Sequence, residues 1–358
     1  MKKCLLLLLI AQAFTPNAFA EKQEQNSSDY NLSEVEDLAP AQSTVSSYLW
    51  TKEAQGSRKA LTKTATTVSP LMTAHTNPIK VMSTVVTTPI FWGSSWSGSQ
   101  ANPIFISDKI VGLTLWYNNL QSSPYTSTVS EYTTLNLSSI APLFVTSATS
   151  VSSSNPANVL TQVCTTVGTA NLKANSYYPV YTDLPRGTAN YCAYHSAGIC
   201  AGSTTPVQFA FFFNIDNDPG CDPASPYAPK VGTTNAQAPG SILTGGSGLP
   251  QQSQGLAALA NITAHELMET VTDPAYFTIT GGITSGYWGG WYDSTGAENG
   301  DKCAWTFGPS NNTGLSAGTV LIGGYDWKLQ GEWSNKAQNA KTGYPTQSGL
   351  LKGCVTGS

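Results

Sequence analysis

The sequence is short of charge. Asp, Glu, Lys and Arg make up only 11% of its 358 residues, against about 25% in an average soluble protein. Acids outnumber bases by 21 to 17, so the chain lacks the basic surface that nucleic acid binding requires. We therefore expect no nucleic-acid partner, and a surface built largely from Ser, Thr, Asn, Gln and Gly, as is typical of extracellular proteins.

Long apolar segments are also absent. The most apolar run, Leu5–Ile10, is far shorter than the roughly 20 residues that a membrane-spanning helix needs. Two lysines precede it and Ala18-Phe19-Ala20 follows it, which is the pattern of a secretory signal peptide. We therefore predict a signal peptide over residues 1–20, no membrane span, and a secreted protein, either extracellular or periplasmic. Without those residues the formal net charge falls from −4 to −6, because they hold two lysines and no acid.

No two cysteines have the C-x-x-C spacing of a zinc knuckle or a redox site. Six of the seven cysteines follow the predicted signal peptide, and an even number in an exported chain indicates disulfides rather than thiolate ligands. Six cysteines can pair in many ways, and their spacing does not choose among them. They are Cys164, Cys192, Cys200, Cys221, Cys303 and Cys354.

The N-terminal part of the mature chain has few large apolar side chains. Residues 21–75 are rich in Ser, Thr, Gln and Ala and show no sustained hydrophobic period, so they bury little surface against the entropy cost of ordering. We expect a flexible, propeptide-like leader there. The remaining residues, 76–358, carry all six of these cysteines and most aromatics, which favours one large domain.

Hydrophobic patterns predict both strands and helices in that domain. We expect strands over 81–93, 176–183 and 207–215, the last so apolar that it should be central, and helices over 107–121 and 255–274. The residues beyond are rich in Gly and aromatics, which indicates short strands and long loops. The fold class is therefore α/β (α+β), a mixed sheet packed on a helix and stapled by disulfides.

Histidine is scarce, with only three in the chain, yet one begins the run HELME (265–269). On a helix, His265 and Glu269 point the same way from successive turns, so both could bind one ion. Glu266 could hold a water against that ion as a general base, as in the H-E-x-x-H zinc peptidases. Here a glutamate stands where the second histidine of that motif is expected.

A catalytic zinc usually has three protein ligands, so a further ligand is needed. Glu298 and Asp301 lie in WYDSTGAENGDKCAW (291–305). We assign Glu298 to the metal and expect Asp301 to accept the imidazole N–H of the helix histidine, which would set its tautomer. Asp273, two turns beyond His265, is a rival for either role.

The acids of this charge-poor chain gather in two short stretches, one of them on an otherwise apolar helix. Burying so many carboxylates without a cation would be costly, which favours a metal site over a purely structural cluster, although H-E-x-x-E alone is a weak pattern. Zn²⁺ is the first expectation. A ligand set with two carboxylates and one imidazole is harder than that of a typical zinc site, so another divalent cation remains an alternative.

A second histidine stands between two cysteines. His195 lies in NYCAYHSAGIC, which we expect to be a loop restrained by a disulfide. Its functional interpretation is an extra metal ligand or a donor to the reacting oxyanion, with Tyr194 as the neighbouring alternative. The competing interpretation is an exposed loop histidine, and His75 is expected to be exposed to solvent.

Four motifs, in this order, resemble those of secreted proteins related to the plant phosphate-induced, EXORDIUM-type family. The resemblance covers roughly residues 76–358 and implies an extracellular protein whose helix is similar to that of zinc-dependent peptidases, with a zincin-like fold. It supports His195, His265, Glu266, Glu269 and Asp301, although Ala193 replaces a family glycine. The family is linked to growth and cell expansion without a settled activity. The motifs are YCAYH (191–195), AHELMETVTDP (264–274), WYDSTGAENGDKC (291–303) and LQGEWSN (329–335).

The sequence therefore predicts a secreted metallopeptidase-like hydrolase. The ion would be held by His265, Glu269 and Glu298, and the substrate would be a peptide or another extracellular or cell-wall component. One alternative is a non-catalytic binder of cell-wall glycans with a structural metal and aromatic loops. Another is a metal-free glycosidase that uses Glu266 and Glu298 as its carboxylate pair.

Overall fold

The protein is described by a computed structural model that covers seven stretches of the chain. They are residues 45–55, 71–97, 103–146, 151–223, 253–280, 283–308 and 318–357. The predicted signal peptide lies outside these residues. The predicted leader is described only at 45–55 and 71–75, and in both places the chain contributes to a β-sheet.

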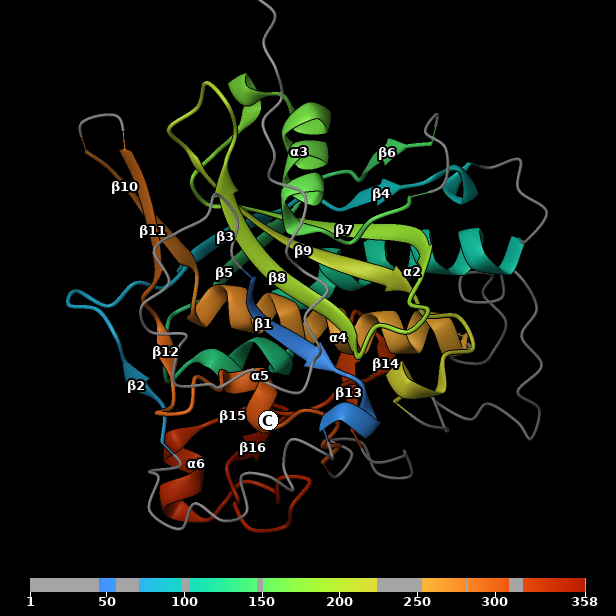
Figure 1. Ribbon diagram of the computed structural model, residues 1–358. Coiled ribbons are helices and arrows are strands. Elements are labelled where there is room, and N and C mark those ends of the chain that lie inside the picture. The colour runs from blue at the N-terminus through green and yellow to red at the C-terminus, as the bar shows by residue number, and fades with distance from the viewer. Residues whose placement is uncertain are drawn as a thin grey trace, which may run out of the picture.

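An eight-stranded mixed sheet forms the centre of the molecule (Figure 1). The order of its main path is β1-β8-β9-β7-β3-β5, with β4 paired to β7 and β6 to β4. The pairs β1–β8 and β8–β9 are antiparallel and the others are parallel. The strands are β1 (Val45–Trp50), β3 (Thr84–Thr87), β4 (Ile90–Trp92), β5 (Asn136–Ser139), β6 (Leu143–Val145), β7 (Ser176–Pro185), β8 (Tyr191–Ile199) and β9 (Pro206–Asn214).

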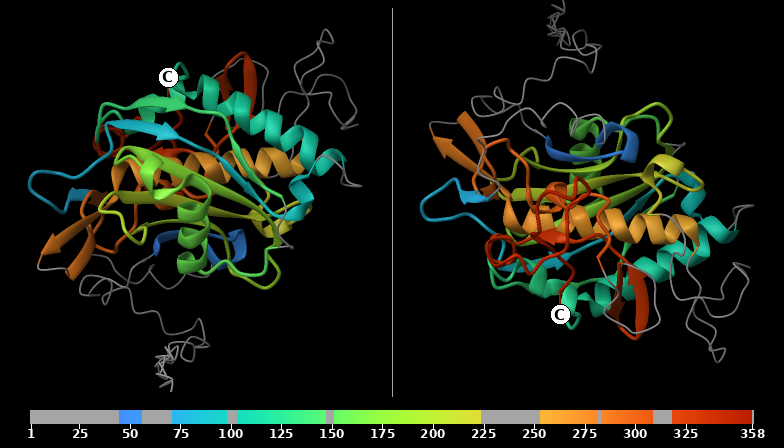
Figure 2. Two further views of the ribbon diagram at one scale, coloured as in Figure 1. Left: turned by 90° about the horizontal axis from the view of Figure 1, so that it is seen from above. Right: turned by 90° about the horizontal axis from the view of Figure 1, so that it is seen from below.

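Helices cover both faces of this sheet. The helices α2 (Pro103–Leu120) and α4 (Gln254–Thr272) pack together on one face, and α3 (Pro156–Val167) lies on the other (Figure 2). Because both faces are covered, β7, β8 and β9 are buried along almost their whole length. None of the helices among the described residues combines the length and apolarity needed to cross a membrane.

Apart from the β10–β11 hairpin, the segments after α4 form small elements that lie below it in the view of Figure 1. The hairpin of β10 and β11 projects from the body of the molecule, as Figure 1 shows. These elements are β10 (Ala275–Thr280), β11 (Ile283–Trp288), β12 (Trp291–Tyr292), which pairs with β2 (Thr73–Ala74), α5 (Asn299–Lys302), β13 (Thr319–Ile322), β14 (Tyr325–Lys328), β15 (Glu332–Trp333), α6 (Asn335–Ala340) and β16 (Cys354–Val355).

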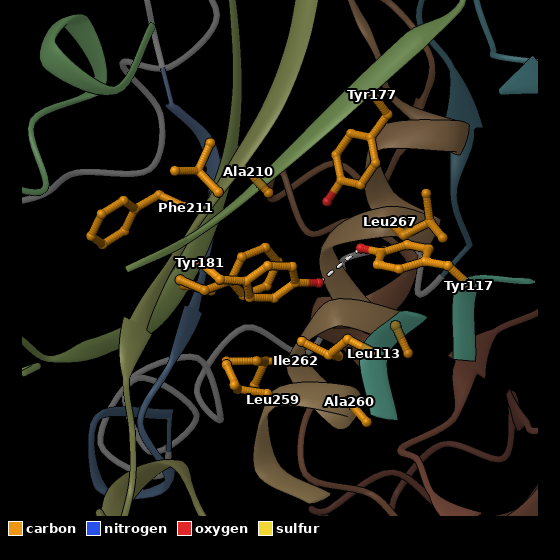
Figure 3. Close-up of a cluster of buried hydrophobic side chains, with 14 of the residues drawn as sticks. Leu113, Tyr117, Tyr177, Tyr181, Ala210, Phe211, Leu259, Ala260, Ile262 and Leu267 are labelled. Carbon is orange, nitrogen blue, oxygen red and sulfur yellow. Dashed lines mark hydrogen bonds between the residues drawn. The ribbon is translucent and has the colours of Figure 1, made fainter. Parts of the chain in front are cut away.

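The core between the sheet and α4 includes a buried hydrogen-bond junction. The Tyr181 hydroxyl of β7 lies 2.9 Å from the Tyr117 hydroxyl of α2 and 2.9 Å from Thr263 Oγ1 of α4. Figure 3 shows Tyr117 and Tyr181 meeting among aliphatic and aromatic side chains. Since buried hydroxyls are costly without a partner, this junction favours one packing of the three elements and sets the position of α4 against the sheet.

All six cysteines of the predicted domain form disulfides, as expected. The pairs are Cys164–Cys200, Cys192–Cys221 and Cys303–Cys354. The two cysteines that flank His195 therefore bind other segments and not each other.

The structure confirms the mixed α/β class and the helices and strands predicted within 76–358. It differs around His195, which lies on β8 and not on a loop. The physical reason is that both faces of β8 are covered, so its sequence lacks the apolar–polar alternation that marks a half-exposed strand.

Candidate metal centre

The helix α4 carries three polar residues of the centre into the protein interior. Its Ser253 N-cap accepts a hydrogen bond from Leu256 N, and the helix ends at Thr272 ahead of Pro274, since the residue before proline avoids the helical region. The side chains of His265, Glu266 and Glu269 are 0% exposed. The helix thus holds a histidine and two carboxylates out of water.

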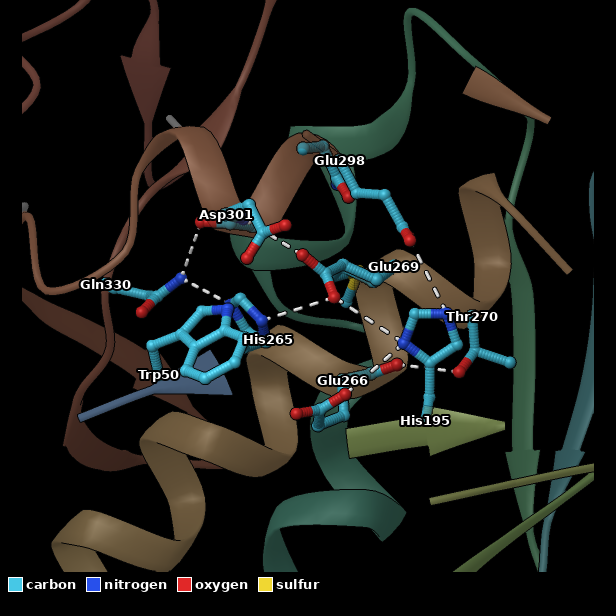
Figure 4. Close-up of polar contacts among 12 residues, drawn as sticks. Trp50, His195, His265, Glu266, Glu269, Thr270, Glu298, Asp301 and Gln330 are labelled. Atoms are coloured by element: carbon cyan, nitrogen blue, oxygen red, sulfur yellow. Dashed lines mark hydrogen bonds and ion pairs between the residues drawn. The ribbon is translucent and has the colours of Figure 1, made fainter. Parts of the chain in front are cut away.

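The strand β8 brings His195 onto the same cluster. Its ring is also 0% exposed and faces α4. His195 Nδ1 lies 3.3 Å from Glu266 Oε2 and 3.5 Å from Glu269 Oε2. Its other nitrogen, Nε2, lies 3.6 Å from Glu298 Oε2. Figure 4 shows the imidazole between the helix carboxylates and Glu298.

Glu269 lies between the two histidines. Its Oε2 is 3.2 Å from His265 Nε2, in addition to the contact with His195, and its Oε1 accepts a hydrogen bond of 2.9 Å from Asp301 N. The glutamate that replaces the second histidine of the peptidase motif is therefore the residue that connects the elements of this centre.

The short helix α5 packs against α4 at the cluster. Glu298 is its N-cap and Asp301 lies in its first turn. A Cβ added to Gly300 would lie 2.6 Å from His265 Nδ1 and 2.9 Å from Glu269 Oε1, closer than side-chain atoms pack. Only glycine allows this approach, and the disulfide of Cys303 to Cys354 anchors the helix from its other end.

Gln330 is a member of the centre that sequence reasoning did not single out. Its Oε1 accepts a hydrogen bond from Trp305 N at 3.2 Å, and its Nε2 donates to Gly300 O at 3.1 Å and to His265 Nδ1 at 2.9 Å. Because these backbone partners set the orientation of the amide, Nδ1 is an acceptor. A neutral His265 ring then carries its proton on Nε2, which faces Glu269.

Glu332 was also missed, although it lies within LQGEWSN. It is 0% exposed, and its Oε1 accepts a hydrogen bond of 2.8 Å from the Tyr125 hydroxyl. Burial raises the pKa of Glu332 well above its ordinary value. A single acid within a resemblance motif carries no signal of its own, since only the fold brings β15 beneath α4.

The buried carboxylates of the centre favour positive charge on the groups around them. Burial lowers the pKa of each histidine, but the surrounding carboxylates outweigh it, raising the pKa of His265 to about 10 and that of His195 well above its ordinary range. Burial raises the pKa of Glu266. Burial also raises the pKa of Glu269, but the contacts with the two histidines outweigh this effect and lower the pKa of Glu269 to about 2. Gln330, however, donates to His265 Nδ1, so it offers no acceptor for the proton that this nitrogen would carry in a doubly protonated ring.

Several atoms of the cluster have no hydrogen-bond partner among the described residues. They are His195 Nε2, His265 Nε2, Glu266 Oε1 and Glu269 Oε2. Three of them still have ion-pair contacts, since His265 Nε2 lies 3.2 Å from Glu269 Oε2 and His195 Nε2 lies 3.6 Å from Glu298 Oε2. A buried polar atom without a hydrogen bond, such as Glu266 Oε1, costs about 1–3 kcal/mol, so the cluster is a place that a bound cation would stabilise.

The donor atoms are spaced as ligands of one ion are. Two ligands of a tetrahedral zinc are about 3.3–3.5 Å apart at the usual bond lengths, and the contacts of Glu269 and Glu266 with the histidines span 3.2–3.5 Å. The buried group His195, Glu266 and Glu269 could hold a metal ion, and so could the group His265, Glu269 and Asp301. The residues present therefore fit a divalent cation.

Two of the predicted site residues have other surroundings. Tyr194 lies on the opposite face of β8, where its hydroxyl donates a 2.6 Å hydrogen bond to Ser154 O. Neighbouring strand residues point to opposite faces, so Tyr194 cannot face the cluster with His195, and its predicted oxyanion role is corrected. Asp273 accepts a 2.7 Å hydrogen bond from Gly290 N and belongs to neither candidate ligand group. Burial raises its pKa to about 6.

Comparison with known proteins adds no family name to this geometry. No protein-family model, no curated protein and no solved structure matches the chain. The functional reasoning therefore rests on the residues of the centre alone.

Proposed function

We propose that this protein is a metal-dependent hydrolase of peptide bonds, whose ion is held by His195, Glu266 and Glu269. The observation that carries the proposal is the convergence of one fully buried imidazole and two fully buried carboxylates, whose ligand atoms lie within 4.8 Å of one another. The position of α4, packed on the sheet next to the edge formed by β8 and β1, also supports a zincin-like arrangement.

A divalent cation in this position would supply Lewis acidity, which polarises an amide carbonyl. Glu266 has Oε2 toward His195 and keeps Oε1, which has no hydrogen-bond partner, to accept a proton from the attacking water. Zn²⁺ is the first choice. Two carboxylates beside one imidazole would also suit manganese or iron.

Both other candidate ligands receive supporting roles in this proposal. His265 has its Nε2 proton directed at Glu269 and would hold that carboxylate in place. Glu298 lies beside His195 Nε2 and would accept the proton of that nitrogen, as carboxylates do behind many metal-bound histidines. The division of roles thus differs from the sequence expectation, in which His265 and Glu298 were ligands.

The test combines metal analysis with peptidase assays. We expect about one equivalent of metal per purified wild-type chain and a loss of that metal in His195→Ala. Glu266→Gln keeps an oxygen ligand but cannot take up a proton, so at saturating metal it should bind the ion and lose hydrolysis. Full hydrolysis by Glu266→Gln at full metal occupancy would overturn the proposed mechanism.

A structural metal site is the second candidate, and one observation favours it. Every side chain of the proposed ligand group is 0% exposed, which is more typical of a closed structural site than of an open catalytic one. A purified protein that retains its metal but hydrolyses no peptide would support this alternative. The glycosidase alternative is less supported, because the His195 ring lies between Glu266 and Glu298, where the sugar would have to bind.

A further inference from the structure

The strand that carries His195 has its outer edge covered by another strand. β1 lies along the outer edge of β8, the strand that carries His195, and its own outer edge pairs with no other strand among the described residues. Without β1, the edge of β8 would present unpaired N–H and C=O groups directly beside the cluster. Such an edge is a template for an extended peptide, which binds by adding a strand.

We propose that the β8 edge is a binding site for an extended, uncharged peptide, and that β1 occupies it as a displaceable internal stand-in. The inference rests on the proposed function for the cleavage of that peptide, but not for its binding. It gives the substrate class: a strand-forming segment with a bulky aliphatic residue at the position of Leu49.

β1 pairs with β8 at the residues that lie next to the cluster. Ser47 pairs with His195, Tyr48 with Tyr194 and Leu49 with Ala193. The register shifts between Val45 and Ser47 and again between Leu49 and Trp50. On the other side of β8, pairing with β9 is regular from Ala193 to Ile199. The β1 ladder is therefore the shorter and less regular of the two that β8 makes.

The side chains around β1 form a recognition site. Leu49 is 0% exposed and belongs to the core, and since it pairs with Ala193 it lies on the same face of the sheet as His195. Tyr48 lies on the other face, where its ring contacts that of Tyr194 at 5.8 Å. An occupant of the β8 edge thus places alternate side chains on the two faces of the sheet. The aliphatic side chain is buried on the face that carries the cluster.

The chain just after Leu49 is also held by the layer that carries α5. Trp305 Nε1 donates a 2.8 Å hydrogen bond to Trp50 O, and Gln55 Nε2 donates to Asp301 O at 3.4 Å. Trp305 has φ +56°, a left-handed conformation that is unusual for a bulky residue. The Trp50 ring itself lies beside that of Tyr48, at 5.3 Å between the ring centroids. Trp305 therefore offers a donor for a peptide carbonyl at the border of the metal centre.

Charge is consistent with this occupant. β1 reads VSSYLW and has no ionisable side chain apart from a tyrosine, while the centre beside it is rich in carboxylates. The position of Leu49 is fully buried, where a charged side chain would lose its hydration, so a neutral strand is the expected ligand.

Peptide binding in trans tests the proposal. The probe is a fluorescent peptide, TVSSYLWT, which copies residues 44–51. We expect weak binding to the wild-type chain, where β1 competes at high effective concentration. The double variant Leu49→Ala with Trp50→Ala should bind the probe at least tenfold more tightly. A probe with Asp in place of its Leu should not bind. Phe144→Ala on β6, at a residue that is 48% exposed, is the matched control and should behave as the wild type.

The outcomes separate this inference from the proposed function. Probe binding with cleavage supports both. Probe binding without cleavage supports the peptide site, and failure at full metal occupancy to cleave any of a set of neutral peptides that bind there overturns the hydrolase. No gain in probe binding by a folded double variant overturns the peptide site, whatever the activity.

Hydrogen exchange of the wild-type chain covers the case in which the double variant does not fold. If β1 is displaceable, its amides should exchange at least 100-fold faster than those of the β8–β9 ladder, because local release is easier than global unfolding. Equal protection of both ladders would overturn the inference. Trp50→Ala alone, at a half-buried residue, is the milder variant for the probe experiment.

Discussion

The two faces of β8 carry polar side chains in opposite states. On the α3 face, the Tyr194 hydroxyl donates to Ser154 O at 2.6 Å and the Tyr191 hydroxyl lies 3.0 Å from Ser154 Oγ. On the α4 face, His195 lies among the carboxylates of Glu266 and Glu269, and its Nε2 has no hydrogen-bond partner. One strand thus has a face whose hydroxyls are hydrogen-bonded to a neighbouring segment, and a face whose imidazole is surrounded by acids.

The polar surroundings of a buried side chain distinguish packing residues from candidate functional residues more clearly than its burial does. Both Tyr194 and His195 are 0% exposed, so exposure alone does not tell them apart. A buried hydroxyl with a partner contributes to the stability of one fold. Buried carboxylates crowded around two imidazoles instead raise the free energy of the metal-free state, which a cation would lower. Substitutions on the two faces should therefore act on different properties.

The largest effect should come from Glu269→Gln. Glu269 contacts both histidines, and its loss removes a charged ligand, so we expect metal affinity to fall by more than about 100-fold, beyond the effect of losing a supporting residue. Titration with Zn²⁺ under competition from a chelator measures it. Tyr194→Phe on the opposite face is the control, and equal affinity of both variants would remove the distinction between the faces.

Gln330→Glu should have a smaller effect on metal affinity, and the direction of the change distinguishes two roles of His265. A carboxylate next to His265 Nδ1 would accept a hydrogen bond from a proton on that nitrogen. Because Glu269 still accepts from Nε2, the ring would become a doubly protonated imidazolium, whose positive charge would lie close to the bound ion. We expect roughly tenfold weaker metal binding. If His265 were itself the ligand through Nε2, the same substitution would strengthen binding, so a gain in affinity in the chelator titration would contradict the assigned role.

Tyr194→Phe should affect stability and leave the metal in place. It removes one buried hydrogen bond to Ser154 O and leaves that carbonyl with one partner fewer, at a cost of about 1 kcal/mol in the free energy of unfolding. Denaturant unfolding at saturating metal measures it. A loss of metal affinity in this variant would mean that the two faces are coupled.

The smallest effect is expected at a surface ion pair away from the cluster. Burial raises the pKa of Asp218, but its contacts with Arg186 prevail and lower it below the ordinary value. A depressed folded-state pKa stabilises the protein above the unfolded pKa, near 4, and that contribution is lost as the pH falls through the folded value. Asp218→Asn should therefore cost about 0.5 kcal/mol at pH 7, after screening by solvent, and almost nothing once the pH lies below the folded-state pKa of Asp218.

Unfolding curves of both proteins across that pH range check the sign. A cost that grows as the pH falls would be inconsistent with a depressed pKa for Asp218. Metal affinity should not change at pH 7, because neither Asp218 nor Arg186 belongs to a candidate ligand group.

The local parts of this protein could be predicted from local patterns. The apolar period of 255–274 places α4 within a few residues, and the helical repeat puts His265 and Glu269 on one face. The even number of cysteines predicts disulfides, though not their pairing. These features depend on neighbours within a few turns, which is the range over which periodicity acts.

The strands β1 and β8 show where such reasoning stops. β8 is covered on both sides, so no alternation reveals it. β1 is a short segment in polar surroundings whose pairing partner is more than a hundred residues away. Its strand conformation depends on that edge, and the sequence around it carries no separate signal.

The sequence by itself determined the composition of the site: a helix with one histidine and two acids, further acids downstream, and too few other charges to explain them. Only the tertiary structure decided which atoms meet. It placed His195 on the α4 face and Tyr194 on the α3 face by the alternation of a strand, set the His265 proton through the backbone partners of Gln330, and paired β1 with the edge of β8 beside the centre. These outcomes depend on contacts between residues far apart in the chain, and the periodicity of any one segment does not encode them.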